Sequence, residues 1–275
     1  MVNVPKQNGE HVNTLIVGDL HLKQTIILPL LESIIEKESI GRIIFVGDYV
    51  DAHHQQMNLK LYAKQLIYMD NWRNQKMAEG IEIIMLAGNH DVPIITGDKQ
   101  GFSVASADLF YAINDIFLKW QLRVAYKLGN YLVSHAGYNQ DFDLEEWQLQ
   151  PITPEHYGDL IYFSRTVGHL RMGSNYLGSM IWADYSEMLY LYNSHYPLQI
   201  FGHTAKSEIA EIIDDERQLL DIDTFDVQLD EHSKWKLTGN GEVLLHDGET
   251  GRLKILRTNW QSENTINQVN NMFIK

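Results

Sequence analysis

The sequence predicts an α/β fold in which two β-sheets pack face to face and helices cover their outer faces. Two observations lead to this prediction. In the first half of the chain, short apolar runs rich in β-branched residues alternate with segments of helical period, which is the pattern of a parallel sheet. After residue 203, short runs of alternating hydrophobicity follow one another with turn dipeptides between them, which is the pattern of antiparallel strands. A chain of 275 residues can bury a full core, so we expect residues 1–275 to form a single domain.

The strand expected at residues 42–46 ends at Gly47 and Asp48, and Asp51 follows after a short gap. A Gly-Asp pair after an apolar strand is more often a plain turn than a site, but here the pattern recurs. Four further strands end at a small residue beside Asp, Asn or His: Gly18-Asp19-Leu20-His21, Gly88-Asn89-His90-Asp91, Ser134-His135-Ala136-Gly137 and Gly202-His203-Thr204. Because open α/β sheets bind ligands at the carboxyl ends of their strands, we expect a site there, with Asp48 as its central metal-bridging ligand.

Helical segments separate the first three strands. Apolar residues repeat at helical spacing in 27–38 and in 59–72, so the chain starts as β-α-β-α-β and its first three strands run parallel. The stretch 92–128 also has a helical period, and 139–193 is a long aromatic-rich insertion. We expect both to form helical walls beside the site. Beyond residue 203 we expect antiparallel strands that complete a second sheet, at 208–213, 219–222, 242–245 and 253–256.

Composition excludes several classes of protein. With 44% hydrophobic and 21% charged residues and no apolar stretch of membrane-spanning length, the chain is an ordinary globular protein without a membrane partner. A formal net charge of −14 argues against binding nucleic acid through bulk electrostatics. Residues 1–13 are polar and lack the apolar core of a signal peptide, and the chain has no cysteine, so we expect a cytoplasmic protein. The oligomeric state does not follow from the sequence.

The residue types at the strand ends suit metal ions. Carboxylate, imidazole and carboxamide groups together favour borderline divalent metals such as Mn, Fe, Zn or Co, whereas oxygen ligands alone favour Mg or Ca. Two such ions about 3.5–4 Å apart need a shared anionic ligand, and one carboxylate at a strand end can provide it. A lone histidine is more often a surface or capped core residue, so the ordered set carries the argument rather than any single member.

The ordered motifs Gly-Asp-x-His, Gly-Asp-x-x-Asp and Gly-Asn-His-Asp, followed by separate strand ends with histidine, resemble the calcineurin-like metallophosphoesterase superfamily over residues 14–204. Four segments resemble more narrowly the branch of Ser/Thr protein phosphatases and bacterial diadenosine tetraphosphatases: Gly47-Asp48-Tyr49-Val50-Asp51, Ser134-His135-Ala136-Gly137, Ile181-Trp182-Ala183-Asp184 and Asp221-Ile222-Asp223-Thr224. The resemblance implies the four-layer αββα metallophosphatase fold, with mixed sheets flanked by helices.

The resemblance also implies a binuclear metal centre. We expect two divalent ions, with Mn as the first candidate and Fe, Zn, Co or Ni as alternatives. The implied ligands form two sets that share one carboxylate: Asp19, His21 and Asp48 for one metal, and Asp48, Asn89, His135 and His203 for the other.

Two further residues would carry the chemistry. The resemblance implies that His90 protonates the leaving group and that Asp51 orients His90 from behind.

Our leading hypothesis is a phosphoesterase that hydrolyses phosphomonoesters, on phosphoprotein Ser/Thr or of nucleotide polyphosphate type, by attack of a metal-bridging hydroxide. The expected partner is therefore a phosphorylated substrate. One alternative is a phosphodiesterase or nuclease on cyclic or oligonucleotides. The acidic charge disfavours it, and so does Ala205, which stands where nuclease-like and phosphodiesterase-like relatives have a second histidine. The other, a non-enzymatic scaffold, is disfavoured by the retention of every expected ligand.

One departure from the family pattern concerns substrate recognition. Ala52 and His53 stand where the phosphatase branch has Arg-Gly, so a phosphate-binding arginine is missing. Our first candidate to replace it is Arg171, which lies in a glycine-bearing stretch and would present a planar fork to phosphate oxygens. Arg165 and His53 are further candidates. The alternative interpretation is that the two arginines lie on the surface of an aromatic wall and that His53 belongs to a solvated loop.

Overall fold

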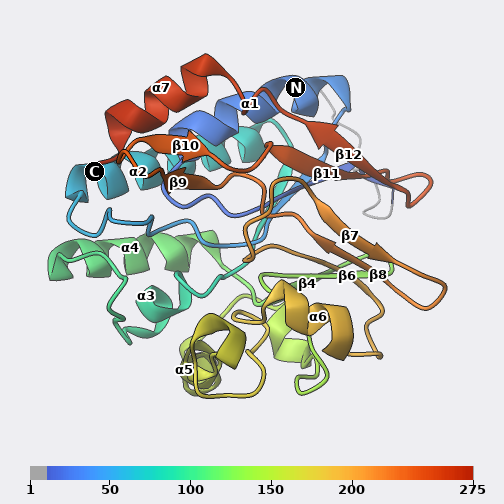
Figure 1. The fold of residues 1–275 in the computed structure, drawn as a ribbon. Helices are drawn as coiled ribbons and strands as arrows, with labels where there is room; N and C mark the ends of the chain where they lie inside the picture. The colour runs from blue at the N-terminus through green and yellow to red at the C-terminus, as the bar shows by residue number, and fades with distance from the viewer. Residues whose placement is uncertain (1–10, 275) are drawn as a thin grey trace.

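The computed structural model of the protein describes residues 11–274 and contains two five-stranded sheets packed face to face (Figure 1). The first sheet has the order β12-β11-β1-β2-β3, formed by β1 (Thr14–Val17), β2 (Arg42–Phe45), β3 (Glu82–Met85), β11 (Glu242–His246) and β12 (Leu253–Arg257). The second has the order β4-β5-β6-β8-β7, formed by β4 (Ala125–Leu128), β5 (Tyr131–Ser134), β6 (Leu198–Phe201), β7 (Ala210–Ile213) and β8 (Gln218–Asp221). Helices flank the sheets, so the predicted α/β sandwich of two mixed sheets is confirmed.

The first three strands form the parallel unit that the sequence predicts. α1 (Gln24–Lys37) connects β1 to β2, and α2 (Leu59–Ala78) connects β2 to β3. The register pairs Ile16 with Ile44 and Ile44 with Ile84. Because a parallel connection must return to the starting edge of the sheet, the carboxyl ends of all three strands lie together.

The alternation of side chains along each strand builds the layers. Ile44 of β2 and Ile200 of β6 belong to one buried cluster between the two sheets. Phe45, the next residue of β2, points to the opposite face and joins the cluster under α1 and α2. Phe201, the next residue of β6, joins a smaller buried cluster with residues of α6 (Tyr185–Leu191). The central strands of each sheet are therefore buried on both faces.

The later strands divide between the two sheets, which differs from our expectation. β11 pairs antiparallel with β1, and β12 pairs antiparallel with β11, so both extend the first sheet instead of completing the second. β8 runs parallel to β6 and antiparallel to β7, so not all of the late strands are antiparallel to their neighbours. The physical reason is that β1 would otherwise present an unpaired edge, which β11 covers.

The stretch 92–128 is helical only in part. α3 (Val92–Thr96) and α4 (Ala107–Trp120) follow one another, and α4 ends where Gln121 adopts a left-handed φ of 56°. Residues 125–128, which we expected to be helical, form β4 because they pair antiparallel with β5 across a tight turn.

The stretch 139–193 contains short helices joined by irregular chain. They are η1 (Glu146–Leu149), η2 (Pro154–His156), α5 (Tyr157–Arg165), η3 (His169–Arg171) and α6, of which the three η elements are 3₁₀ helices. The expected wall segment is thus present as a mixture of helix and loop.

The C-terminal part adds three elements that the sequence patterns did not predict. β9 (Val227–Leu229) and β10 (Trp235–Leu237) form a separate two-stranded sheet, and α7 (Glu263–Met272) ends the described chain beside α1 (Figure 1). The rings of Trp235 and Phe273 lie 5.2 Å apart between centroids, which packs the hairpin against the end of α7.

Residues 1–10, which make up most of the polar N-terminal stretch, lie outside the described residues. Between residues 11 and 274, none of the helices combines the length and the apolar character that a membrane crossing requires.

The buried interface between the sheets should dominate stability. Ile44 is fully buried there, so Ile44→Ala should lower the free energy of unfolding by about 2–5 kcal/mol through lost burial and the remaining cavity. Ile213 on β7 is 59% exposed, and Ile213→Ala is the matched control with an expected change within about 0.5 kcal/mol. Urea unfolding followed by circular dichroism measures both variants. Equal effects of the two substitutions would contradict this assignment of the core.

Candidate metal centre

The carboxyl ends of five strands from both sheets converge on one polar cluster. β1 contributes Asp19 and His21, β2 contributes Asp48 and Asp51, and β3 contributes Asn89 and His90, while β5 and β6 contribute His135 and His203. All eight side chains had been proposed from the sequence as metal ligands or catalytic groups. The structure places each of them within contact distance of at least one other member.

Asp48 lies at the middle of the cluster. Its Oδ2 atom is 3.4 Å from Nε2 of His21 and 3.5 Å from Nε2 of His135. Two groups of side chains offer ligand atoms within 4.8 Å of one another, namely His21, Asp48 and His90, and Asp48, His135 and His203. Because Asp48 belongs to both groups, one carboxylate is positioned to serve two neighbouring cation sites.

The imidazoles of His21 and His135 form hydrogen bonds through Nδ1, which leaves an unprotonated Nε2 of each ring facing Asp48. Nδ1 of His135 lies 3.0 Å from the carbonyl oxygen of Val46, and Nδ1 of His21 lies 2.7 Å from that of Asp51. A carbonyl oxygen only accepts, so each Nδ1 is the protonated nitrogen and each Nε2 presents a lone pair. Nε2 of His135 also lies 2.9 Å from Oδ1 of Asn89. Electron-rich atoms thus face one another, and a cation between them would remove the repulsion.

Two buried atoms of the cluster lack a hydrogen-bond partner among residues 11–274. They are Oδ2 of Asp19 and Nε2 of His203. An unpaired buried polar atom costs about 1–3 kcal/mol, more when it is charged, so such atoms require an explanation. Coordination to a divalent ion would satisfy Oδ2 of Asp19, whereas His203 faces the cluster with its other ring nitrogen, Nδ1, which lies 3.2 Å from Nε2 of His135. The donor set of carboxylate, imidazole and carboxamide oxygen therefore fits the metals expected from the sequence.

Burial favours the uncharged forms of several side chains of the cluster. Burial, together with the charges of Asp223 and Asp48, raises the pKa of Asp19 well above its usual value. Burial also lowers the pKa of His135 and of His203, and it lowers that of His21 to about 4. The imidazoles of His21, His135 and His203 are consequently neutral near pH 7, which leaves their nitrogens able to bind a cation.

The backbone at the cluster is held in a strained conformation. Asp48, Asp51 and His203 have φ values of 52°, 53° and 72°, in the left-handed region that side chains other than glycine rarely adopt. Such strain costs about 1–3 kcal/mol per residue and concentrates at functional sites. Gly47 has a φ of 120°, and a Cβ atom there would overlap the backbone nitrogen of Gly88. The two strand-end loops therefore approach too closely for any larger residue.

Asp91 holds these loops together, a role that the sequence motif contained but that we had not assigned. Its Oδ2 accepts hydrogen bonds from the backbone N–H groups of Asp48 at 2.7 Å and Gly88 at 2.9 Å, and its Oδ1 accepts one from Tyr49 at 3.0 Å. Asp91 is fully buried. One carboxylate thus fixes the backbone on both sides of the proposed bridging ligand.

His90 lies beside the cluster and is oriented by Asp51. Nδ1 of His90 is 3.1 Å from Oδ2 of Asp51, and Oδ1 of the same carboxylate accepts a hydrogen bond from the hydroxyl of Tyr62 on α2. Burial alone would lower the pKa of His90, but Asp48 and the hydrogen bond to Asp51 raise it to about 9. We had expected Tyr62 only as a core residue, and a helical apolar period gives no signal for its contact with Asp51.

The three candidates for phosphate binding lie in different places. Nε of Arg171 is 2.9 Å from Oδ2 of Asp184, and its Nη2 donates to Oγ1 of Thr204 beside the cluster. Arg165 instead forms an exposed ion pair with Asp98, at 2.9 Å. His53 lines the pocket next to the cluster. Arg171 and His53 are therefore close to the candidate site, whereas Arg165 points to a surface carboxylate.

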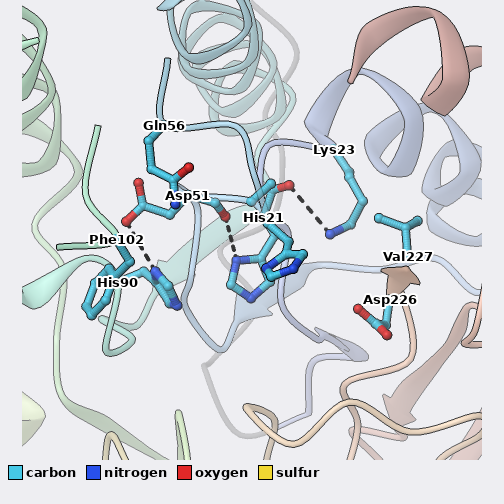
Figure 2. Close-up of a pocket in the computed structure, with 10 residues that line it drawn as sticks. His21, Lys23, Asp51, Gln56, His90, Phe102, Asp226 and Val227 are labelled. Carbon is cyan, nitrogen blue, oxygen red and sulfur yellow. Dashed lines mark hydrogen bonds and ion pairs between the residues drawn. The ribbon is translucent and has the colours of Figure 1, made fainter. Parts of the chain in front are cut away.

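A pocket of about 240 Å³ opens beside the cluster. Figure 2 shows His21 in the middle of its lining, with His90 and Phe102 on one side and Lys23 and Asp226 on the other. Lys23 was not among the residues that the sequence suggested. A lysine at the start of a helix is ordinarily solvent-exposed, so nothing in its local sequence marks it.

Comparison with known proteins agrees with this geometry. The family model described as calcineurin-like phosphoesterase matches residues 12–207. No curated protein matches the sequence significantly. Among solved structures, a cold-active protein tyrosine phosphatase from a psychrophilic Shewanella species is 16% identical, with 90% of this chain and 81% of that chain covered and a TM-score of 0.51. A protein serine/threonine phosphatase from Saccharomyces cerevisiae is also 16% identical, with 91% and 80% covered and a TM-score of 0.52. These two structures share the fold with this chain.

If Asp48 serves two cations, its replacement should affect both. We expect Asp48→Asn to weaken the binding of both Mn ions. The loss of affinity should exceed the factor of about 10 to 100 that is lost when a group supporting a metal ligand is removed. Calorimetric titration with Mn and metal analysis after dialysis measure the stoichiometry and affinity. Asp115→Asn, an exposed position on α4, is the control and should bind Mn like the wild type. Loss of one ion only would show that Asp48 is not shared.

Proposed function

Because the chain belongs to the calcineurin-like phosphoesterase family, we propose that it hydrolyses phosphomonoesters with the help of two divalent ions. The observation that carries this proposal is the position of Asp48, whose Oδ2 lies 3.4 Å from Nε2 of His21 and 3.5 Å from Nε2 of His135. A phosphoester hydrolase needs a concentrated positive charge at such a point, because the phosphoryl group gains negative charge on its outer oxygens during transfer.

The ligands would be those that the family resemblance implies. It assigns Asp19, His21 and Asp48 to one ion and Asp48, Asn89, His135 and His203 to the other. The groups of ligand atoms in the structure support Asp48 with His21, and Asp48 with His135 and His203. Asp19 lies 3.7 Å from His21, and Asn89 lies 2.9 Å from His135. When bound, the ions would supply an activated water at neutral pH and positive charge for the phosphoryl oxygens. Mn remains our first candidate because the set mixes nitrogen and oxygen donors.

The chain's own contribution to bond cleavage would come from His90. Its Nδ1 is engaged with Asp51, so Nε2 is the atom that can give a proton to the oxygen of the leaving group. As the bond from phosphorus to that oxygen breaks, the proton prevents the release of a free alkoxide. Asp51, held in turn by Tyr62, would keep the ring in the tautomer and orientation that this transfer requires.

His90 also lies within reach of His21 and Asp48, so a ligand role and an acid role must be separated by experiment. We expect His90→Asn to retain two Mn ions per chain and to lower kcat on phenyl phosphate by about 10²- to 10⁴-fold. The loss should be smaller on nitrophenyl phosphate, because that leaving group needs little protonation. Steady-state assays and metal analysis on the same preparations measure both properties.

His195→Asn serves as the control, because this side chain is 77% exposed, and it should leave both properties unchanged. The acid role would be refuted if His90→Asn lost metal, or if its kcat fell equally on both esters.

A further inference from the structure

Lys23 is a buried cation on the wall of the pocket. It follows β1 at the start of α1, and only 2% of its surface is exposed. Its side chain lines the pocket together with His21, Ala52 and His90. Figure 2 shows its amino group directed toward the backbone oxygen of His21, at the side of the pocket opposite His90. Lysine is among the residues least often buried without a partner.

The ammonium group has unused hydrogen-bonding capacity. Among residues 11–274, Nζ makes one hydrogen bond, to the backbone oxygen of His21 at 3.5 Å. Carboxylates of the described chain act on it as charges without forming an ion pair within 4.0 Å, namely those of Asp226, Asp223, Asp19 and Asp48. An ammonium carries three donors, and a buried charge with unmet donors is costly. Asp226 also lines the pocket, but its Oδ2 is held by Gln228 at 2.9 Å and by Thr238 at 2.6 Å. Lys23 therefore offers donors to a molecule in the pocket.

The arginines near the site are already engaged. Nη2 of Arg171 donates to Thr204 and to the backbone oxygen of His203, and its Nε lies 2.9 Å from Asp184, so the protein already directs two of its three nitrogens. Arg165 pairs with Asp98 at the surface. Ala52, in contrast, has a short side chain and lines the same pocket as Lys23.

We propose that Lys23 binds a non-bridging oxygen of the substrate's terminal phosphate and makes the enzyme selective for phosphomonoesters over phosphodiesters. This inference rests on the proposed phosphoesterase function. A monoester carries about two negative charges near pH 7, whereas a diester carries one and has a second ester group in place of a free oxygen. A buried ammonium therefore gains more from the monoester, through both charge and a charge-assisted hydrogen bond.

Lys23→Met tests this inference, because it keeps the length of the side chain and removes the charge. We expect the Mn-loaded variant to bind inorganic phosphate about 10- to 100-fold more weakly than the wild type in calorimetry. We expect kcat/KM to fall by a similar factor on nitrophenyl phosphate and by less than about 3-fold on bis(nitrophenyl) phosphate. Lys23→Arg, which retains the charge, should recover most of the loss. Lys60→Met at an exposed position is the control.

The possible outcomes separate the two claims. A wild type that binds Mn and phosphate but hydrolyses neither ester refutes the proposed function, while the phosphate titration still decides the role of Lys23. Unchanged phosphate binding in Lys23→Met overturns the inference. So does an equal loss on both esters, or a loss of bound Mn or of cooperative unfolding, since each of these would show a general structural role.

Discussion

The site depends on holding electron-rich atoms close together inside a protein. One carboxylate oxygen of Asp48 faces two imidazole nitrogens within 3.5 Å. Such an arrangement is unfavourable by itself, because like partial charges repel strongly where water is excluded. The rest of the folded chain must supply the free energy that keeps these groups in place. Bound cations would offset part of this cost and stabilise the folded state.

The fold provides that free energy through its two sheets. The parallel strands β1 to β3 end at one edge, the strands β5 and β6 end opposite them, and the apolar cluster between the sheets fixes the distance across the gap. Asp91 then ties the loops after β2 and β3 to each other through three backbone hydrogen bonds. The left-handed backbone at Asp48 persists because these contacts over-determine it. Rigid support of this kind holds the side chains of the site in place.

Sequence patterns predicted the part of the molecule that local rules control. The strand ends from Asp19 to His203 were recognisable because an apolar strand followed by a small residue and a ligand recurs in order. Sheet membership was harder, because β11 and β1 are paired across more than two hundred residues and nothing local tells which edge a late strand will cover. Residues 125–128 form β4 because a turn pairs them with β5, and the helical period of the stretch 92–128 gave no sign of that turn. Asp91 and Tyr62 were missed for a common reason. Their roles come from burial and from distant partners, which a spacing of residues cannot reveal.

The account rests on the claim that Asp48 joins two metal ions. Crystals grown with Mn and measured by anomalous diffraction test it most directly, because they locate the ions without reference to activity. The account predicts two anomalous peaks about 3.5–4 Å apart, with Asp48 in contact with both, Asp19 and His21 at one, and Asn89, His135 and His203 at the other. A single peak, or two peaks of which only one contacts Asp48, would contradict it.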